Sequence, residues 1–484
     1  MQVAAGKADR GQIAAIAIVL FALAVLTISA AGGYPLKSTS AVLALTVAIA
    51  AAYRFALAWR NLLALLVLIV LFIPIRRYAL PGNLPFQLEP YRLFVAFLLL
   101  AWATSLLIDR RVRLRRSGFE APFLLVVAGA LVSDIANPGR FGAESTYAVK
   151  QLSFFLSFIV VFYVVVTLVR TFDDLSYLVV MLVGGGTIVG GSAIIESRTH
   201  FNVFNHLHTA MPFLRPVPDL LETSDARGFR VVASAQHPIA LGAALVLLVP
   251  LAVYLAQTTR QRRWTLSAVV LAIAALATVS RTAVLMLFAV ALVFLLLRPV
   301  ETKRLWPFLL PALLAAHIAA PGTLGTIKNS FFPKGGLIAE QNYGKGTNVR
   351  GRGRIADLGP SLQEWKQRPL FGEGFGTRIS SGPDANAPIL DDQWLGTLLE
   401  VGAFGFCAFI WLFVRPLRRL FREAKRDTSE RGWLLTALAA SVAAFATGML
   451  TYDALAFIQV TFLLFIMLAL AASALALPRN QAAR

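Results

Sequence analysis

The segment HPIALGAALVLLVPLAVYLA, residues 237–256, decides the fold of this chain. It contains no Asp, Glu, Lys or Arg, and a helix of about 20 apolar residues is long enough to cross the hydrocarbon core of a bilayer. The basic sequence RQRR follows at 260–263, and basic loops next to membrane spans face the cytoplasm. We therefore predict a transmembrane helix over 237–256 whose carboxyl end lies in the cytoplasm.

Apolar runs of the same kind recur along the whole chain. About fourteen of them approach the roughly 17–25 residues that a spanning helix needs, although 61–75 and 264–280 are short. We therefore predict an all-α polytopic membrane protein with about 12–14 transmembrane helices. The runs lie near 13–31, 41–58, 61–75, 91–108, 119–135, 148–169, 174–196, 237–256, 264–280, 281–298, 304–320, 392–414, 431–450 and 454–477.

The composition excludes an ordinary cytosolic enzyme. Hydrophobic residues make up 58% of the chain and charged residues 14%, whereas soluble domains average roughly 45–50% and about 25%. The net charge of +20 would suggest a nucleic-acid partner in a soluble protein, but beside membrane spans it reflects orientation, so we expect no nucleic acid. Cys407 is the only cysteine and the five histidines are scattered. We therefore expect no disulfide within the chain, no metal and no cofactor.

Basic segments set the orientation. When the apolar runs alternate in direction, DRRVRLRR (109–116), RPVETKR (298–304) and RPLRRLFREAKR (415–426) fall on the same side as RQRR. This side is predicted to be cytoplasmic. Two long loops, near 197–236 and 321–391, then lie outside and carry many arginines and lysines.

Long loops in a compact protein are usually functional. Arginine suits the bidentate binding of phosphate, so the outer face is suited to an anionic substrate. The larger loop should contain short helices. One is predicted within DLGPSLQEWKQRP (357–369), with Pro360 near its start and Pro369 past its end. The predicted divisions of the chain are 1–236, 237–320, 321–391 and 392–484, the third being this extracytoplasmic loop.

Two glycine-rich segments have structural interpretations. FGEGFG (371–376) is similar to a phosphate loop, but it lacks a preceding strand and a following Lys-Ser/Thr pair, so we reject nucleotide binding. GGG at 184–186 lies inside an apolar run. Close helix packing is the expected reason.

Arg281 and Glu400 are ionisable residues within apolar surroundings, where a charge is costly and therefore suggests function. Arg281 lies between two apolar runs with almost no loop. It is interpreted as an anion-binding residue, with a snorkelling arginine as the alternative. Glu400 needs a partner. A structural ion pair is as plausible for it as a role in catalysis.

Other candidates lie where outer loops meet predicted helices. Asp391 and Asp392 lie at the outer start of the run at 392–414, and helix capping is the simpler explanation for both. His237 precedes Pro238 at a helix start, where a packing role is the alternative to ligand binding. Asp453 is interpreted as a turn residue, and no metal is assigned to His200, His206 and His208.

Four segments, in order, resemble the O-antigen ligase and polymerase family of bacterial membrane glycosyltransferases. They are RVVASAQHPIALG (230–242), SRTAVL (280–285), RIADLGPSLQEWKQRPLFGEGFGT (354–377) and DDQWLGTLLEVGAFG (391–405). Three positions depart from the family pattern. Asp391 stands where ligase-type members carry His, Asp392 where they carry Asn, and Ala233 where Gly is more usual.

The resemblance implies an inverting, metal-independent transfer of a glycan from a polyprenyl-diphosphate carrier to a glycan or lipid acceptor. The reaction would take place at the outer face of the bacterial inner membrane, in contact with membrane lipids. The predicted catalytic residues are Arg230, Arg281 and Asp391, with Arg227 as the alternative to Arg230. The predicted substrate-binding residues are Arg227, Arg354, Asp392, Glu400 and His237.

Two other functions stay open at this point. A flippase or transporter of lipid-linked oligosaccharide would also need an outer cationic site, but such proteins usually show internal repeats, and the sequence shows none. A peptidoglycan-type glycan polymerase is similar in architecture, and the four segments fit it less well. The sugar, the linkage, the choice between ligase and polymerase, and the oligomeric state stay undetermined.

Overall fold

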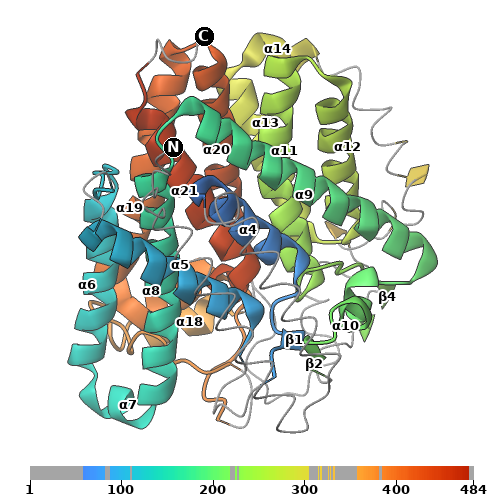
Figure 1. Ribbon diagram of the computed structural model, residues 1–484. Coiled ribbons are helices and arrows are strands. Elements are labelled where there is room, and N and C mark those ends of the chain that lie inside the picture. The colour runs from blue at the N-terminus through green and yellow to red at the C-terminus, as the bar shows by residue number, and fades with distance from the viewer. Residues whose placement is uncertain are drawn as a thin grey trace, which may run out of the picture.

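The computed structural model describes residues 58–81, 88–108, 112–217, 224–225, 228–304, 357–380 and 384–478, with isolated positions between 314 and 332. This part of the chain is almost entirely helical (Figure 1). The long helices are α4 (Trp59–Phe72), α5 (Pro90–Ile108), α6 (Glu120–Ala136), α8 (Ser145–Leu168), α9 (Phe172–Thr199), α11 (Pro238–Thr259), α12 (Arg262–Ala277), α13 (Arg281–Leu297), α19 (Gln393–Arg426), α20 (Glu430–Gly448) and α21 (Ile458–Ala476).

Short elements connect the long helices. The strand β1 (Tyr78–Ala79) pairs with β2 (Arg215–Pro216), and β3 (Ser224–Asp225) pairs with β4 (Gly228–Phe229), both antiparallel. The short helical elements are α7 (Pro138–Ala143), η1 (Val203–His206), α10 (Leu207–Ala210), α14 (Pro299–Arg304), α18 (Leu358–Trp365) and η4 (Ala454–Ala456).

Six of the described helices are long and apolar enough to cross a membrane, namely α5, α8, α9, α11, α19 and α21. The predicted all-α polytopic class is therefore confirmed. The predicted runs from 61–75 to 281–298 and from 392–414 onward each correspond to a helix. The runs near 13–31, 41–58 and 304–320 lie almost wholly outside the described residues.

Helix α21 forms the centre of the bundle (Figure 1). Its apolar window is 94% buried, against 17% for α5, whose outward leucines and phenylalanines are exposed at the periphery. Small residues allow close helix packing, as GGG at 184–186 predicted. A Cβ on Gly186 of α9 would lie 2.2 Å from Leu248 of α11, and one on Gly185 would lie 2.9 Å from Leu71 of α4.

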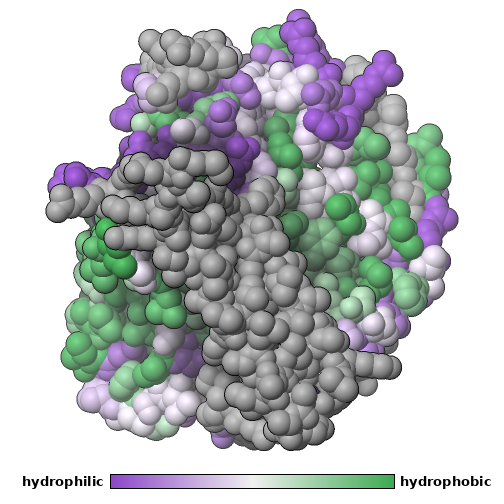
Figure 2. All heavy atoms as spheres, in the orientation of Figure 1, coloured by the Kyte–Doolittle hydropathy of each residue, from purple (hydrophilic) through white to green (hydrophobic). Residues whose placement is uncertain are grey.

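The bundle has two ends, which we call the basic end and the distal end. The basic end carries α14, and the distal end carries α7, α10 and α18 (Figure 1). Figure 2 shows hydrophilic residues gathered at the basic end. Arginines here bind backbone carbonyls. Arg298 donates to Ala424 O at 3.2 Å and Asp427 O at 2.6 Å at the carboxyl end of α19, and Arg415 Nε donates to Gly118 O, just before α6, at 2.9 Å.

Helix α19 is broken at Gly402, whose φ of 61° and ψ of −169° are not helical. The chain segment 369–374 repairs the break. Ala403 N donates to Pro369 O at 2.8 Å and Phe404 N to Leu370 O at 3.1 Å, while Gly374 N donates to Glu400 O at 3.1 Å. The FGEGFG sequence and the two residues before it therefore supply the backbone partners that the interrupted helix lacks.

Gly402→Ala is expected to destabilise the protein by at least about 2 kcal/mol, because a side chain is strained at positive φ. Its Cβ would also lie 2.5 Å from Leu370 O. The matched control is Gly396→Ala in the same helix, where a Cβ meets nothing within 4 Å and alanine is favoured by up to about 1 kcal/mol. Thermal unfolding in detergent compares the two variants. Equal melting temperatures would contradict the structural role of the break.

Candidate functional site

Three connections converge at the distal end. They are the loop 230–237 before α11, the turn 278–281 between α12 and α13, and the connection 449–457 between α20 and α21. Arg230 Nε donates to Thr278 O at 3.0 Å, which joins the first to the second. Thr451 Oγ1 donates to Thr282 Oγ1 at 2.9 Å, which joins the third to the start of α13. We call this convergence the distal site.

A buried carboxylate shapes the loop that carries Arg230. Glu196, at the end of α9, accepts the N–H of Val232 at 3.2 Å and that of Ala233 at 2.8 Å. Ala233 has a φ of 40°, in the left-handed region that glycine adopts most easily. This conformation gives a physical reason for the glycine that the family more often carries there. Arg230 itself is 2% exposed.

Arg77 holds the same loop from the opposite side. It is buried and donates to Ala233 O and Asn205 Oδ1, both at 3.0 Å, and to Ala235 O. Burial lowers the pKa of Arg77 to about 10, and the charge of Glu196 opposes this change. The guanidinium therefore stays charged at pH 7. Sequence reasoning missed both residues, although Glu196 at the end of a predicted apolar run was a detectable signal.

Glu196→Gln is expected to lower the free energy of unfolding by roughly 1–3 kcal/mol, because a neutral amide replaces a charged acceptor of buried N–H groups. The control is Asp173→Asn, an exposed acid in the first turn of the same helix. It should change stability by no more than about 1 kcal/mol, the size of a helix-dipole effect. Thermal unfolding in detergent measures both variants. A smaller loss for Glu196→Gln than for Asp173→Asn would contradict the role of Glu196.

The Ser-Arg turn is strained and closely packed. Ser280 occupies the N-cap of α13 and Arg281 its first position. The preceding Val279 has a φ of 52°, which is an outlier for a β-branched residue. A Cβ on Gly242 of α11 would lie 2.8 Å from Thr278 Oγ1, so glycine is what lets α11 approach this turn. The segments 230–242 and 280–285, which carry two of the family motifs, are thus brought into contact.

The start of α19 is fixed to the connection 449–457. Asp392 Oδ1 accepts the N–H of Leu395 at 3.1 Å and so caps the helix. Gln393 N donates to Met449 O at 2.8 Å, and Gln393 Oε1 accepts the N–H of Leu455 at 2.9 Å. Asp391 is exposed, with a φ of 51°, a conformation that Asp and Asn adopt more readily than other side chains.

His237 packs against this same connection. Its Nδ1 accepts the N–H of Ile239 at 3.2 Å, so the side chain caps α11. The ring stacks on Phe457 at a centroid distance of 5.6 Å, and Phe457 stacks on Tyr452 at 5.6 Å. These contacts agree with the packing role at a helix start that is the alternative for His237, and its role in substrate binding stays a prediction.

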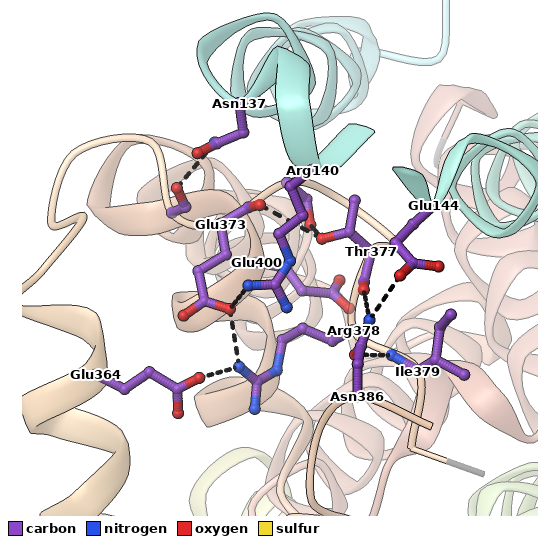
Figure 3. A network of polar contacts seen from close by, with 12 residues as sticks. Asn137, Arg140, Glu144, Glu364, Glu373, Thr377, Arg378, Ile379, Asn386 and Glu400 are labelled. Carbon is purple, nitrogen blue, oxygen red and sulfur yellow. Dashed lines mark hydrogen bonds and ion pairs between the residues drawn. The ribbon is translucent and has the colours of Figure 1, made fainter. Parts of the chain in front are cut away.

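Glu400 lies beside an ion-pair network around the GEGFG loop (Figure 3). Glu373 pairs with Arg140 at 2.8 Å and with Arg378 at 3.1 Å, and Arg378 also pairs with Glu364 at 2.6 Å. The Glu400 carboxylate accepts a hydrogen bond from the backbone of Gly376 and interacts electrostatically with Arg378 and Asp453. The partner that the sequence argument required for Glu400 is therefore this network.

Three hydroxyl groups at the distal site are buried without a hydrogen-bond partner in the described part of the chain. They belong to Ser234, Ser280 and Tyr452, one from each converging connection, with exposures of 0%, 2% and 0%. Leaving such a group unsatisfied costs about 1–3 kcal/mol. Ser234 lies in the connection that carries Arg230, Ser280 precedes Arg281, and Tyr452 lies in the third connection. The distal site thus presents hydroxyl and guanidinium donors together, a composition suited to an anion.

The structure places the predicted site residues in three groups. Arg230, Arg281, His237, Asp391 and Asp392 lie at the distal site, and Glu400 lies beside it. Arg227 and Arg354 lie outside the described residues. Within the described ranges, no group of three His, Cys, Asp or Glu side chains is placed to hold a metal ion.

The long apolar helices define the class of this molecule as an all-α polytopic membrane protein. A sequence model described as O-antigen ligase matches residues 266–410, a range that holds three of the four segments and supports the resemblance that they carry. The matched range runs from α12 through Arg281 and the GEGFG loop to the break in α19. No curated protein matches the chain. The family and the helices together indicate a membrane glycosyltransferase of the bacterial inner membrane.

Proposed function

We propose that this protein transfers a glycan from a polyprenyl-diphosphate carrier to a glycan or lipid acceptor at the distal site. The observation that supports this most directly is the convergence of Arg230 and Arg281 with the buried hydroxyls of Ser234, Ser280 and Tyr452. A diphosphate carries several negative charges and many acceptor oxygens. Arginine and hydroxyl donors match both properties.

The chemistry is a single displacement at the anomeric carbon. The acceptor oxygen forms a bond to this carbon while the bond between the carbon and the diphosphate oxygen breaks. The diphosphate carrier leaves with the electron pair, and fixed cations stabilise the charge that develops on it. Arg230 and Arg281 take this role in place of a divalent metal, and the displacement inverts the anomeric centre.

Asp391 is the proposed general base. An exposed carboxylate at the start of α19 is accessible to an incoming acceptor, and it takes the hydroxyl proton if it lies within hydrogen-bond reach. His237, Asp392 and Glu400 would shape the substrate-binding surface, together with Arg227 and Arg354 of the two outer loops.

The orientation follows from the basic end. Positively charged loops remain in the cytoplasm, so the end that carries RQRR and α14 faces inward and the distal site faces outward. A site on this face is accessible to lipid-linked glycans in the outer leaflet. This orientation also places the acceptor outside the cell membrane.

A flippase is the second candidate, because interrupted helices are typical of transporters and α19 is interrupted at Gly402. In transporters, the unwound carbonyls coordinate the transported ions. Here the carbonyls of Leu399 and Glu400 already accept the N–H groups of Glu373 and Gly374 at 2.9 and 3.1 Å. The break is filled by protein, which favours glycan transfer.

A reconstituted assay distinguishes the two functions. Proteoliposomes would receive a polyprenyl-diphosphate oligosaccharide donor and a lipid-linked acceptor, with EDTA present. Formation of a longer glycan or a conjugate is the expected result. Movement of the lipid across the bilayer without a new glycosidic bond would refute the transferase and support the flippase.

A further inference from the structure

The chain that repairs the break in α19 is exposed along one half. Every residue from Lys366 to Phe371 is exposed, whereas every residue from Gly372 to Thr377 is buried. The exposed half reads Lys-Gln-Arg-Pro-Leu-Phe and follows Trp365, whose Nε1 donates to Pro369 O at 3.1 Å. We call residues 366–371 the outer strip.

The outer strip lies alongside a membrane helix. The carbonyls of Pro369 and Leu370 accept the N–H groups of Ala403 and Phe404. Helix α19 is long and apolar enough to cross a membrane. The strip therefore lies against a candidate membrane-spanning segment, with its own side chains exposed.

Apolar side chains of the strip continue onto the neighbouring helices. Leu370 is 63% exposed and Phe371 40%, next to Phe404 of α19 at 44% and near the end of α6, where Ile135 is 77% exposed. The rings of Phe371 and Phe404 meet at a centroid distance of 6.3 Å. An exposed apolar surface of this kind is removed from water when it faces the acyl chains of lipids. A tryptophan next to it is typical of the interface between membrane and water.

Two cations border this apolar surface. Lys366 and Arg368 are exposed, and no ion pair to either occurs within the described ranges. Lysine and arginine at a membrane surface attract anionic headgroups. We propose that the outer strip binds an anionic phospholipid, whose phosphate contacts Lys366 and Arg368 and whose acyl chain lies along Leu370 and Phe371.

A phospholipid of the surrounding bilayer fits the outer strip better than the diphosphate carrier does, because of where the strip lies. The strip lies on the outside of α19, whereas Arg230 is buried and Arg281 partly buried within the bundle. The proposal is independent of glycan transfer, and it gives the strip a role that the catalytic argument leaves unassigned. Lipid bound here would hold the segment that completes α19.

A single-cysteine fluorescence experiment tests this proposal on the full chain. Cys407→Ala removes the only cysteine, and Gln367→Cys then carries an environment-sensitive fluorophore within the strip. The control is Gly142→Cys in α7, where a Cβ meets nothing within 4 Å. In phosphatidylcholine nanodiscs with spin-labelled lipid, position 367 should be quenched and position 142 should not. Equal quenching by aqueous iodide at both positions would overturn the proposal.

The charge requirement is tested in the same nanodiscs. Spin-labelled phosphatidylglycerol should occupy the site about tenfold more readily than spin-labelled phosphatidylcholine, given two cations near the surface. Lys366→Glu with Arg368→Glu should abolish this preference at position 367. Lys303→Glu with Arg304→Glu, at the basic end, should leave it unchanged. Equal quenching by the two lipids in the parent protein would refute the binding of an anionic headgroup.

Discussion

Arg281→Ala is expected to lower the rate of glycan transfer by about 10²–10³-fold, the usual cost of removing one fixed donor that stabilises a developing negative charge. Arg281 begins α13 directly after the strained Val279 turn. The backbone of this turn fixes where the Arg281 side chain begins. The loss should appear mainly in kcat, since the charge on the diphosphate grows as the bond breaks.

Single-turnover transfer in proteoliposomes measures this effect. Arg281→Lys should recover part of the rate, because lysine keeps the charge but loses the bidentate geometry. The control is Arg304→Ala, an exposed arginine of α14 at the basic end, which should transfer glycan at the parental rate. An Arg281→Ala protein within tenfold of the parent would remove Arg281 from the proposed chemistry.

Asp391→Asn is expected to lower transfer by about 10²–10⁴-fold while donor binding is retained, because general-base catalysis contributes that range. Asparagine also tolerates the left-handed backbone of this position, so the start of α19 should keep its conformation. Donor binding is measured by retention of a labelled carrier. Asp384→Asn, an exposed acid that accepts from Tyr147 OH at 2.7 Å, is the control and should leave transfer unchanged.

The family pattern offers a second test of the same position. Asp391→His restores the residue that ligase-type members carry, and it should recover measurable transfer. The rate should fall as the pH drops through about 6.5, because a protonated imidazole cannot accept a proton. A histidine variant as inactive as Asp391→Asn would argue against a general base at this position.

The sequence was sufficient to predict the helices but not the break in α19. Apolarity and charge alone located each described span, because a bilayer demands length and hydrophobicity above all. The run from Gln393 onward stays apolar through Gly402 and Gly405. Glycine is common in membrane helices for packing reasons. The local sequence does not distinguish Gly402, which lies at the break, from Gly405, which lies at a helix contact with Gly129 of α6.

The candidate site was partly predictable for a related reason. Arg281 could be found because a charge between two apolar runs is conspicuous. Arg77 could not, because it lies in an ordinary loop and its contacts with Ala233 and Ala235 span more than 150 positions of chain. Ser234 and Tyr452 carry no sequence signal at all. Their meaning comes only from burial without a partner.

The central place of α21 has a consequence for biogenesis. The helix that the others enclose is also synthesised after the described helices that pack on it, among them α4, α8, α9, α11, α19 and α20. Until α21 is inserted, the faces of those helices that contact it lack their protein partner. Insertion of α21 therefore completes the protein interior in one late step. A ribosome that stalls before residue 458 would therefore leave an inserted but unassembled bundle for membrane proteases to remove.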